Sequence, residues 1–105
     1  MTDDLQTLAV VPRLFPDIRR GTKTSTIRWA ETRITPGSLR LICGGESLVV
    51  NVTRCTDLPL SQAAAFVGRA ADWPDEVMLQ GMREHYPQIT LQDVVQIVEF
   101  DPPIP

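Results

Sequence analysis

The side chains with the greatest chemical potential are concentrated in segment 19–28, with the sequence RRGTKTSTIR. This segment holds four of the ten Lys and Arg residues and four hydroxyl side chains, and Lys23 is the only lysine in the chain. A desolvated lysine can lose its proton near neutral pH, whereas arginine stays charged, so Lys23 could act as a general base. Thr24, Ser25 and Thr26 carry hydroxyls that a neutral amine could activate as nucleophiles, as in Ser-Lys hydrolases.

The same composition also has a structural interpretation. Threonine-rich runs favour strands, and a lysine at the entrance to a strand is ordinary edge protection. A strand from Thr24 would place Thr24, Thr26 and Arg28 on one face and give Lys23 the opposite parity. Lys23 and Thr26 can then meet only if Lys23 lies in the turn before the strand, or if a bulge redirects it.

Length and charge limit the classes of protein to consider. A chain of 105 residues predicts one domain, which buries roughly two thirds of its unfolded surface. A net charge of −3 and a pI near 5.0 argue against a protein that coats nucleic acid or an anionic membrane indiscriminately. Without a signal peptide or a long apolar run, the chain is expected to be soluble and cytoplasmic, with no membrane partner. Cys and His are not clustered, so no metal or cofactor is expected.

The N-terminal half predicts a strand, a helix and a second strand around segment 19–28. Residues 1–5 are expected to fray, and residues 8–11 read as a buried strand. A helix with an apolar face follows, which begins either at Pro12 or nearer Pro16. Gly21 is a suitable end for it, because glycine adopts a left-handed backbone most readily.

The middle of the chain predicts a hairpin. Residues 29–35 read as a loop that closes at Pro36-Gly37, a strong turn signal. Strands over 39–43 and 47–55 follow, joined through Gly44-Gly45-Glu46. With that turn, Cys43 and Cys55 lie too far apart along the partner strands for a disulfide.

The last third predicts two helices and a strand. Ser61 is a good N-cap for a helix over 62–67 that ends at Gly68. A second helix begins within 73–76 and ends at Pro87, with His85 in its last turn, where a cation suits the helix dipole. Its inner face is expected to consist of Val77, Met78, Met82 and Tyr86. Residues 94–100 read as the last strand, and residues 101–105 are expected to be irregular and frayed.

In this order of elements, four motifs resemble the ASCH domain family over nearly the whole chain. They are Gly21–Arg28, Pro36-Gly37, Tyr86-Pro87 and Ile97–Phe100. Ser38 stands where the family usually has an acid after the turn. The resemblance implies a single α+β domain over residues 1–105, with a PUA-like fold. That fold is a small mixed, mainly antiparallel β-barrel with flanking helices and a cleft associated with RNA or nucleosides.

Small stand-alone members of the family look like bacterial amidohydrolases that remove the acetyl group from N4-acetylcytidine. Their catalytic set is a threonine nucleophile, a lysine and a glutamate. The resemblance places the threonine at Thr26 and the lysine at Lys23. Aligned without a gap through Tyr86-Pro87, the glutamate falls at Ala71, and a shift of one residue makes Asp72 its substitute. Asp75 and Glu76 are the other candidates for this acid.

Further residues are expected to bind the substrate. Arg28 would recognise a base or a phosphate, and Trp29 and Trp73 would stack on a base or pack in the core. Backbone amides at Gly21 or in the first turn of the helix near 73–76 would hold an oxyanion. The hydroxyl of Thr24 belongs to the same group.

Two other functions use the same residues. The first is a non-catalytic RNA-binding module in which Arg19, Arg20, Lys23 and Arg28 contact phosphates. The second is a ribonuclease, which the sequence favours less because the single histidine, His85, has the structural interpretation given above. The acyl group, the choice between a free nucleoside and RNA, and the oligomeric state stay open.

Overall fold

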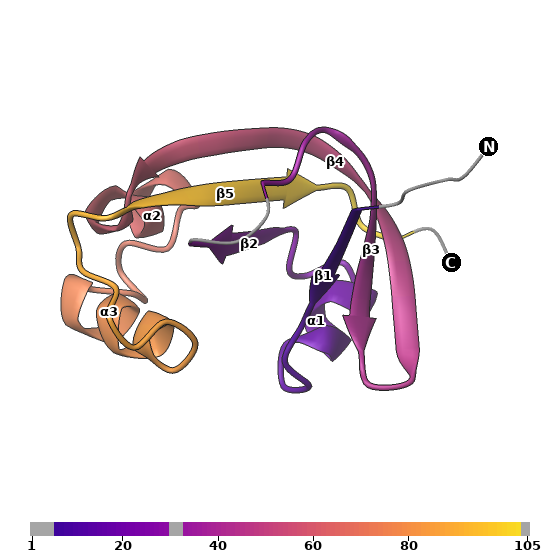
Figure 1. Cartoon of the computed structure of the whole chain (residues 1–105), viewed down its shortest axis with the longest axis horizontal. Helices are drawn as coiled ribbons and strands as arrows, with labels where there is room; N and C mark the ends of the chain where they lie inside the picture. Colours follow the sequence, from indigo (N-terminus) through magenta and orange to yellow (C-terminus); the bar gives the residue numbers. More distant parts are fainter. Residues whose placement is uncertain (1–5, 30–32, 104–105) are drawn as a thin grey trace. The chain divides into compact units, whose positions relative to one another are not determined.

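The computed structural model describes residues 6–29 and 33–103 of the chain (Figure 1). The expected fraying of residues 1–5, 104 and 105 therefore falls outside the described residues. Residues 101–103 are irregular, as predicted, but Asp101 is not frayed, because its amide donates to the Asn51 carbonyl at 2.9 Å. In chain order the elements are β1 (Gln6–Ala9), α1 (Phe15–Arg19), β2 (Ser25–Arg28), β3 (Gly37–Cys43), β4 (Glu46–Pro59), α2 (Leu60–Phe66), α3 (Asp75–Arg83) and β5 (Val94–Phe100). The chain is α+β, as predicted.

The strands form one five-stranded sheet in the order β1-β3-β4-β5-β2. β1 runs parallel to β3, with Gln6 opposite Leu39, and β3 runs antiparallel to β4, with Gly37 opposite Val52. The sheet is therefore mixed. The predicted hairpin is confirmed, although its turn takes only Gly44 and Gly45, because Gly44 has a φ of 58° and closes the turn in two residues.

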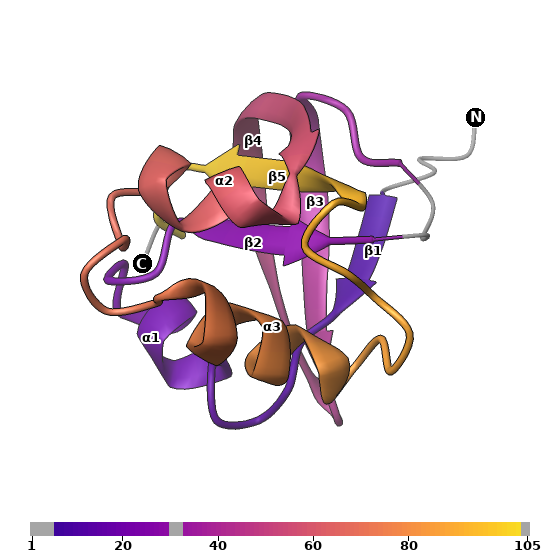
Figure 2. The same cartoon turned by 90° about the vertical axis from the view of Figure 1, so that its left-hand side faces the viewer.

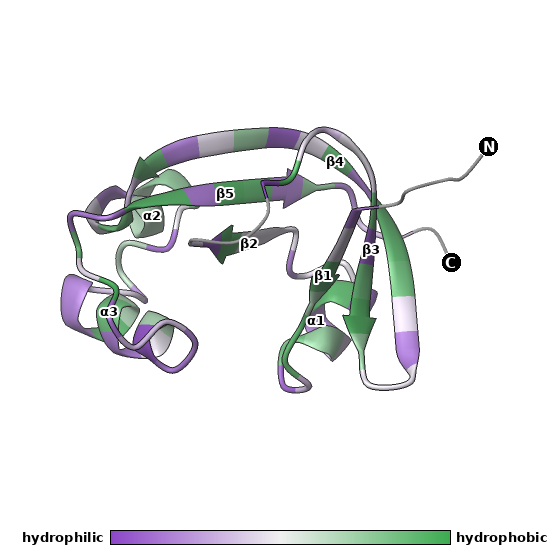
Figure 3. Cartoon of the chain, viewed as in Figure 1, coloured by the Kyte–Doolittle hydropathy of each residue, from purple (hydrophilic) through white to green (hydrophobic). Residues whose placement is uncertain are grey.

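The buried side chains form two clusters, one in each of two compact units. The first unit consists of Met1–Thr26, Ile34–Cys55 and Val98–Pro105, and the second of Ile27–Arg33 and Thr56–Ile97. Exposed and buried residues alternate along β3 and through residues 49–53 of β4, where hydrophobic and hydrophilic bands follow one another (Figure 3). The first cluster consists of Leu8, Phe15, Ile18, Ile34, Leu39, Leu41, Val50, Val52, Val98 and Phe100.

The second unit holds α2 and α3, which the loop 67–74 joins (Figure 2). Its cluster consists of Leu60, Ala63, Ala64, Met78, Met82, Ile89, Val95 and Ile97. The prediction of Val77 on the inner face of α3 is wrong, because this side chain is 50% exposed. β4 also continues past its predicted end at Cys55 to Pro59, and Leu58 packs against the second cluster.

Both helices of the second unit differ from the prediction at one end. Ser61 is not the N-cap of α2, which begins at Leu60 after Pro59 and has no side-chain cap. Instead, the amides of Leu60 and Ser61 donate to the carbonyls of Asp93 and Leu91, at 2.9 and 3.0 Å. These long-range acceptors satisfy the first turn, so a capping hydroxyl is not needed. The predicted end of α2 at Gly68, with a φ of 77°, is confirmed.

The prediction that α3 extends to Pro87 is also wrong, since the helix ends at Arg83. The amides of His85 and Tyr86 both donate to the carbonyl of Met82, which closes a turn instead of continuing the helix. His85 therefore follows the helix and does not lie in its last turn. Its ring lies 6.3 Å from the ring of Tyr86.

In the first unit, polar side chains fix the approach to β3. The side-chain amide of Gln6 donates to the Thr35 carbonyl at 2.9 Å, and the backbone amide of Thr35 donates back to Gln6 Oε1 at 2.7 Å.

On β4, the guanidinium of Arg54 donates to Glu99 at 2.5 Å. This hydrogen bond, together with the charge of Glu99, raises the pKa of Arg54 above its ordinary value.

The length of the helices and the state of the two cysteines bear on membrane partners and on redox chemistry. Within residues 6–29 and 33–103, no helix has the length and apolar character needed to cross a bilayer. Cys43 and Cys55 are both thiols, and Cys43 lies opposite Glu46 at the turn of the hairpin.

Candidate functional site

The segment with the sole lysine begins at the end of α1. The helix starts at Phe15, nearer Pro16 than Pro12, and Pro16 lies in its first turn, where a missing amide proton is tolerated. Arg20 is the C-cap, and Gly21 follows with a φ of 80°, which confirms the predicted glycine stop. The helix thus ends in a left-handed turn that leads directly into Thr22 and Lys23.

One carbonyl of α1 anchors this turn. The Asp17 carbonyl accepts hydrogen bonds from the amides of Thr22 and Lys23, at 3.0 and 3.1 Å, and from the Thr22 hydroxyl at 3.0 Å. The backbone of Lys23 is therefore tied to the helix that precedes it. Sequence reasoning missed this anchor, because a backbone acceptor has no side-chain signature.

The backbone then enters β2 at Ser25, so Lys23 lies in the turn before the strand. This meets the geometric condition that the parity of Lys23 and Thr26 imposes on a reaction between them. Both residues are half-buried, whereas Thr24 is exposed. The Thr24 carbonyl accepts a hydrogen bond from the Phe100 amide at 2.9 Å, which fixes the start of the strand.

The Gly21 amide, one of the two expected oxyanion donors, is already in use. It donates to the Ile18 carbonyl at 3.0 Å as part of the helix end. The developing negative charge of an oxyanion would have to compete with the Ile18 carbonyl for this amide. The first turn of α3 is then the other expected donor.

Arg28 and Trp29 belong to the second unit. Arg28 is the last residue of β2, and its Nε atom is buried. Trp29 packs against the second cluster and meets the ring of Tyr86 edge-on, with centroids 5.9 Å apart and planes at 88°. This geometry is typical of aromatic packing in a core, so it supports the structural interpretation of Trp29.

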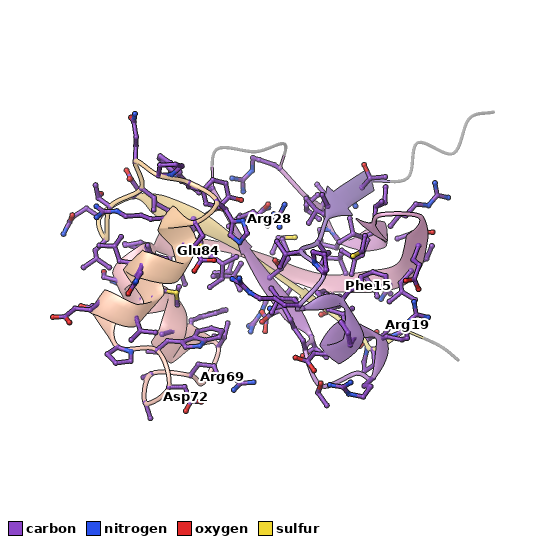
Figure 4. All side chains as sticks on the ribbon, turned by 90° about the horizontal axis from the view of Figure 1, so that it is seen from below. Phe15, Arg19, Arg28, Arg69, Asp72 and Glu84 are labelled. Atoms are coloured by element: carbon purple, nitrogen blue, oxygen red, sulfur yellow. The ribbon has the colours of Figure 1, made fainter. Side chains whose placement is uncertain are left out.

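Asp72 and Trp73 also lie in the second unit, in the loop between α2 and α3. The Asp72 carboxylate pairs with the Arg69 guanidinium at 3.4 Å, and both side chains are exposed (Figure 4). The same guanidinium lies over the Trp73 ring, 5.7 Å from its centroid, in a cation–π contact. Asp75 and Glu76, the other candidate acids, are exposed in the first turn of α3.

The predicted site residues therefore fall into two sets. Gly21, Lys23, Thr24 and Thr26 form one continuous stretch of the first unit, and Arg28, Trp29, Asp72 and Trp73 belong to the second. The chemistry of the first set rests on the amine of Lys23 and the hydroxyls of Thr24 and Thr26, within one anchored turn and strand. The second set is aromatic, acidic and cationic.

Two arginines of segment 19–28 are held in ion pairs. Arg19 pairs with Glu46 at 2.6 Å and lies over the ring of Phe15, 5.3 Å from its centroid (Figure 4). Arg20 pairs with Asp17. A phosphate that bound either guanidinium would have to compete with a carboxylate.

Sequence reasoning also passed over Gln96, the one buried polar side chain recorded among the described residues, which is 7% exposed. Gln96 lies on β5 within the apolar run Val94–Val98, and a single polar residue in such a run could have indicated a buried amide. A buried amide normally has hydrogen-bond partners and helps to define a unique packing arrangement.

Comparisons with known proteins add no assignment. No protein-family model matches the chain, and no curated protein matches it either. Within the described residues, no three His, Cys, Asp or Glu side chains are grouped so that they could hold a metal ion.

Proposed function

We propose that this protein is an amidohydrolase with a PUA-like fold that removes the acetyl group from N4-acetylcytidine or a related N4-acylcytosine nucleoside. The products are cytidine and a carboxylate. One observation supports this proposal most strongly. The sole lysine of the chain is anchored through its backbone in the turn that leads directly into the strand carrying Thr26, and both residues are half-buried.

In the proposed reaction, the Thr26 hydroxyl attacks the acetyl carbonyl carbon while the neutral Lys23 amine takes the hydroxyl proton. The tetrahedral intermediate collapses when the bond from the carbonyl carbon to N4 breaks, and the Lys23 ammonium protonates the leaving nitrogen. This step leaves an ester on Thr26. Lys23 then deprotonates a water molecule that attacks the ester, and carboxylate is released as the threonine regains its proton.

The reaction sets a requirement on Lys23. A lysine with an ordinary pKa of ~10.4 needs a fall of about 3 units to be a base at neutral pH, or roughly 4 kcal/mol. Partial burial and nearby positive charge act in this direction, whereas a nearby carboxylate opposes it. Asp72, the proposed acid, is therefore assigned to proton transfer or to orienting Lys23.

The amidohydrolase is preferred to an RNA-binding module because of the surface charges. Two of the four cations that such a module would use, Arg19 and Arg20, are already paired with carboxylates. Each new phosphate contact would then replace an existing ion pair, with little net gain. A net charge of −3 also gives the chain little general attraction for a polyanion such as RNA.

The test is to incubate the protein with N4-acetylcytidine and, separately, with a short RNA, and to measure acetate release and RNA binding. Lys23→Arg and Thr26→Ala should each reduce turnover roughly 10²- to 10⁴-fold, because each removes a group that acts in the transition state. Matched controls are Arg40→Lys on β3 and Thr7→Ala on β1, both exposed, and they should keep full turnover. Full turnover in Lys23→Arg, or RNA binding without hydrolysis, would contradict the proposal.

A further inference from the structure

The segment that follows β5 is held against the turn that contains Lys23. Phe100, the last residue of β5, is 4% exposed within the first cluster. Its amide donates to the carbonyl of Thr24 at 2.9 Å, so the end of the last strand is bonded to the residue directly after Lys23.

Pro102 closes on the other end of the same turn. A Cβ atom built on Gly21 would lie 3.0 Å from Cβ of Pro102 and 3.5 Å from its Cγ. Carbon atoms in proteins rarely approach as closely as 3.0 Å, so the proline ring fills the space that the missing side chain of Gly21 leaves. The ring is also rigid, which makes it a better support than a flexible side chain.

Between these two contacts, Asp101 ties the segment to β4. Its amide donates to the Asn51 carbonyl at 2.9 Å, and the Asn51 side-chain amide donates to the Asp101 carboxylate at 3.4 Å. Residues 100–102 thus make three successive attachments, to Thr24, Asn51 and Gly21. Phe100 ends β5, and Asp101 and Pro102, which follow the strand, are also attached to the rest of the first unit.

From these contacts we infer that segment 100–102 positions Lys23 for the proposed reaction, an inference that rests on the proposed function. The turn 21–24 is held by the Asp17 carbonyl of α1 on one hand and by Phe100 and Pro102 on the other. With its backbone fixed at both ends, the amine loses less conformational freedom when it reaches its reactive position. Pro102 is therefore a positioning residue that acts through Gly21 and Lys23.

The test uses the fact that the chain has one lysine. Lysine labelled with ¹³C at Cε gives a single side-chain resonance, whose chemical shift and pH titration report on Lys23 without any substrate. Pro102→Gly removes the ring that contacts Gly21, and Pro102→Ala keeps only its Cβ. The matched control is Pro87→Gly, at an exposed proline of the second unit, which lowers the rigidity of the unfolded chain in the same way.

We expect Pro102→Gly to shift the Lys23 resonance, to move its titration toward that of an ordinary lysine, and to lower kcat roughly tenfold with little change in KM. Pro102→Ala should give a smaller change in the same direction and serves if the glycine variant does not fold. Pro87→Gly should leave the resonance and its titration as in the wild type. An unchanged Lys23 resonance and titration in both Pro102 variants would overturn the inference.

The two proposals fail in different ways. If the wild-type protein releases no carboxylate from any N4-acylcytosine nucleoside, the proposed function fails, whereas the resonance of Lys23 still reports whether segment 100–102 holds it. If the wild type is active but the Pro102 variants keep the wild-type resonance and kcat, the positioning role alone fails.

Discussion

A pair of glycine substitutions measures how tightly the turn before Lys23 is packed. Gly21 follows α1 with a φ of 80°, and Gly68 follows α2 with a φ of 77°. Both glycines therefore have the same backbone conformation at the same place relative to a helix. They differ in their surroundings, because a Cβ on Gly21 would meet Pro102 at 3.0 Å, whereas a Cβ on Gly68 meets nothing within 4 Å.

The two alanine variants should consequently differ in stability. An L-residue with a left-handed backbone costs roughly 1–2 kcal/mol. The lower entropy of the unfolded alanine chain offsets about 0.4–1 kcal/mol of this cost. Gly68→Ala should then lower the free energy of unfolding by about 1 kcal/mol. Gly21→Ala adds an overpacked contact worth roughly 1–3 kcal/mol, so its total loss should be roughly 2–4 kcal/mol.

Urea denaturation followed by far-ultraviolet circular dichroism gives both values, provided that the dependence of the free energy on urea is the same in each variant. The double variant Gly21→Ala/Pro102→Gly should recover the part of the loss that comes from the contact, which a double-mutant cycle isolates. Equal losses in Gly21→Ala and Gly68→Ala would show that Pro102 does not press on the turn. That result would refute the packing contact through which segment 100–102 is inferred to position Lys23.

Two further predictions concern the elements around the site. On β5, Ile97→Val should lower the free energy of unfolding by roughly 0.5–1.5 kcal/mol, because Ile97 is fully buried. Val94→Ala, at a side chain that is 57% exposed, should lower it by less than about 0.5 kcal/mol. Equal losses of stability in thermal denaturation would mean that β5 is not packed as described. At the entry to β3, Gln6→Ala should lower the free energy of unfolding by about 1 kcal/mol, because it removes the hydrogen bonds to Thr35. Gln62→Ala, on the exposed face of α2, should cause no measurable loss. Equal urea midpoints for these two variants would contradict the role given to Gln6.

The parts of the fold that the sequence predicted are those in which the signal is local. The apolar run Val94–Phe100 is the last strand, and Gly44-Gly45 is a hairpin turn. Gly21 and Gly68 end helices because only glycine adopts their backbone angles at little cost. In each case the residues themselves, without a distant partner, determine the conformation.

The errors arise where a distant partner decides. The first turn of α2 uses the carbonyls of Leu91 and Asp93, so the capping hydroxyl of Ser61 has no role. Val77 has the right spacing for the inner face of α3, but the second cluster takes Met78 and Met82 instead. Neither outcome is visible in a window of ten or so residues.

The candidate site shows the same division. The sequence predicted the helix end at Gly21 and the strand that follows, and it left open whether Lys23 lies in the turn before β2 or is redirected by a bulge. The sequence did not predict the attachments of residues 100–102 to Thr24, Asn51 and Gly21. They join segments far apart in the chain, and two of them are backbone hydrogen bonds. The aspartate and prolines after β5 predict an irregular tail, but they do not indicate whether that tail is attached to the rest of the chain.

The position of β2 in the sheet links the anchored turn to the proposed chemistry. β2 lies at one end of the strand order, next to β5, so one row of its backbone groups has no neighbouring strand among residues 6–29 and 33–103. A ligand can approach such an edge without displacing a strand, which is how sheet edges recognise extended partners. An edge strand of four residues is by itself weakly held, and the Phe100 bond to Thr24 and the Asp17 bonds to Thr22 and Lys23 compensate for this at its entrance. In the proposed reaction, half-buried Thr26 lies on this edge strand, and the backbone of Lys23 is hydrogen-bonded to α1. A fixed backbone reduces the conformational freedom that Lys23 loses when it activates the Thr26 hydroxyl for attack.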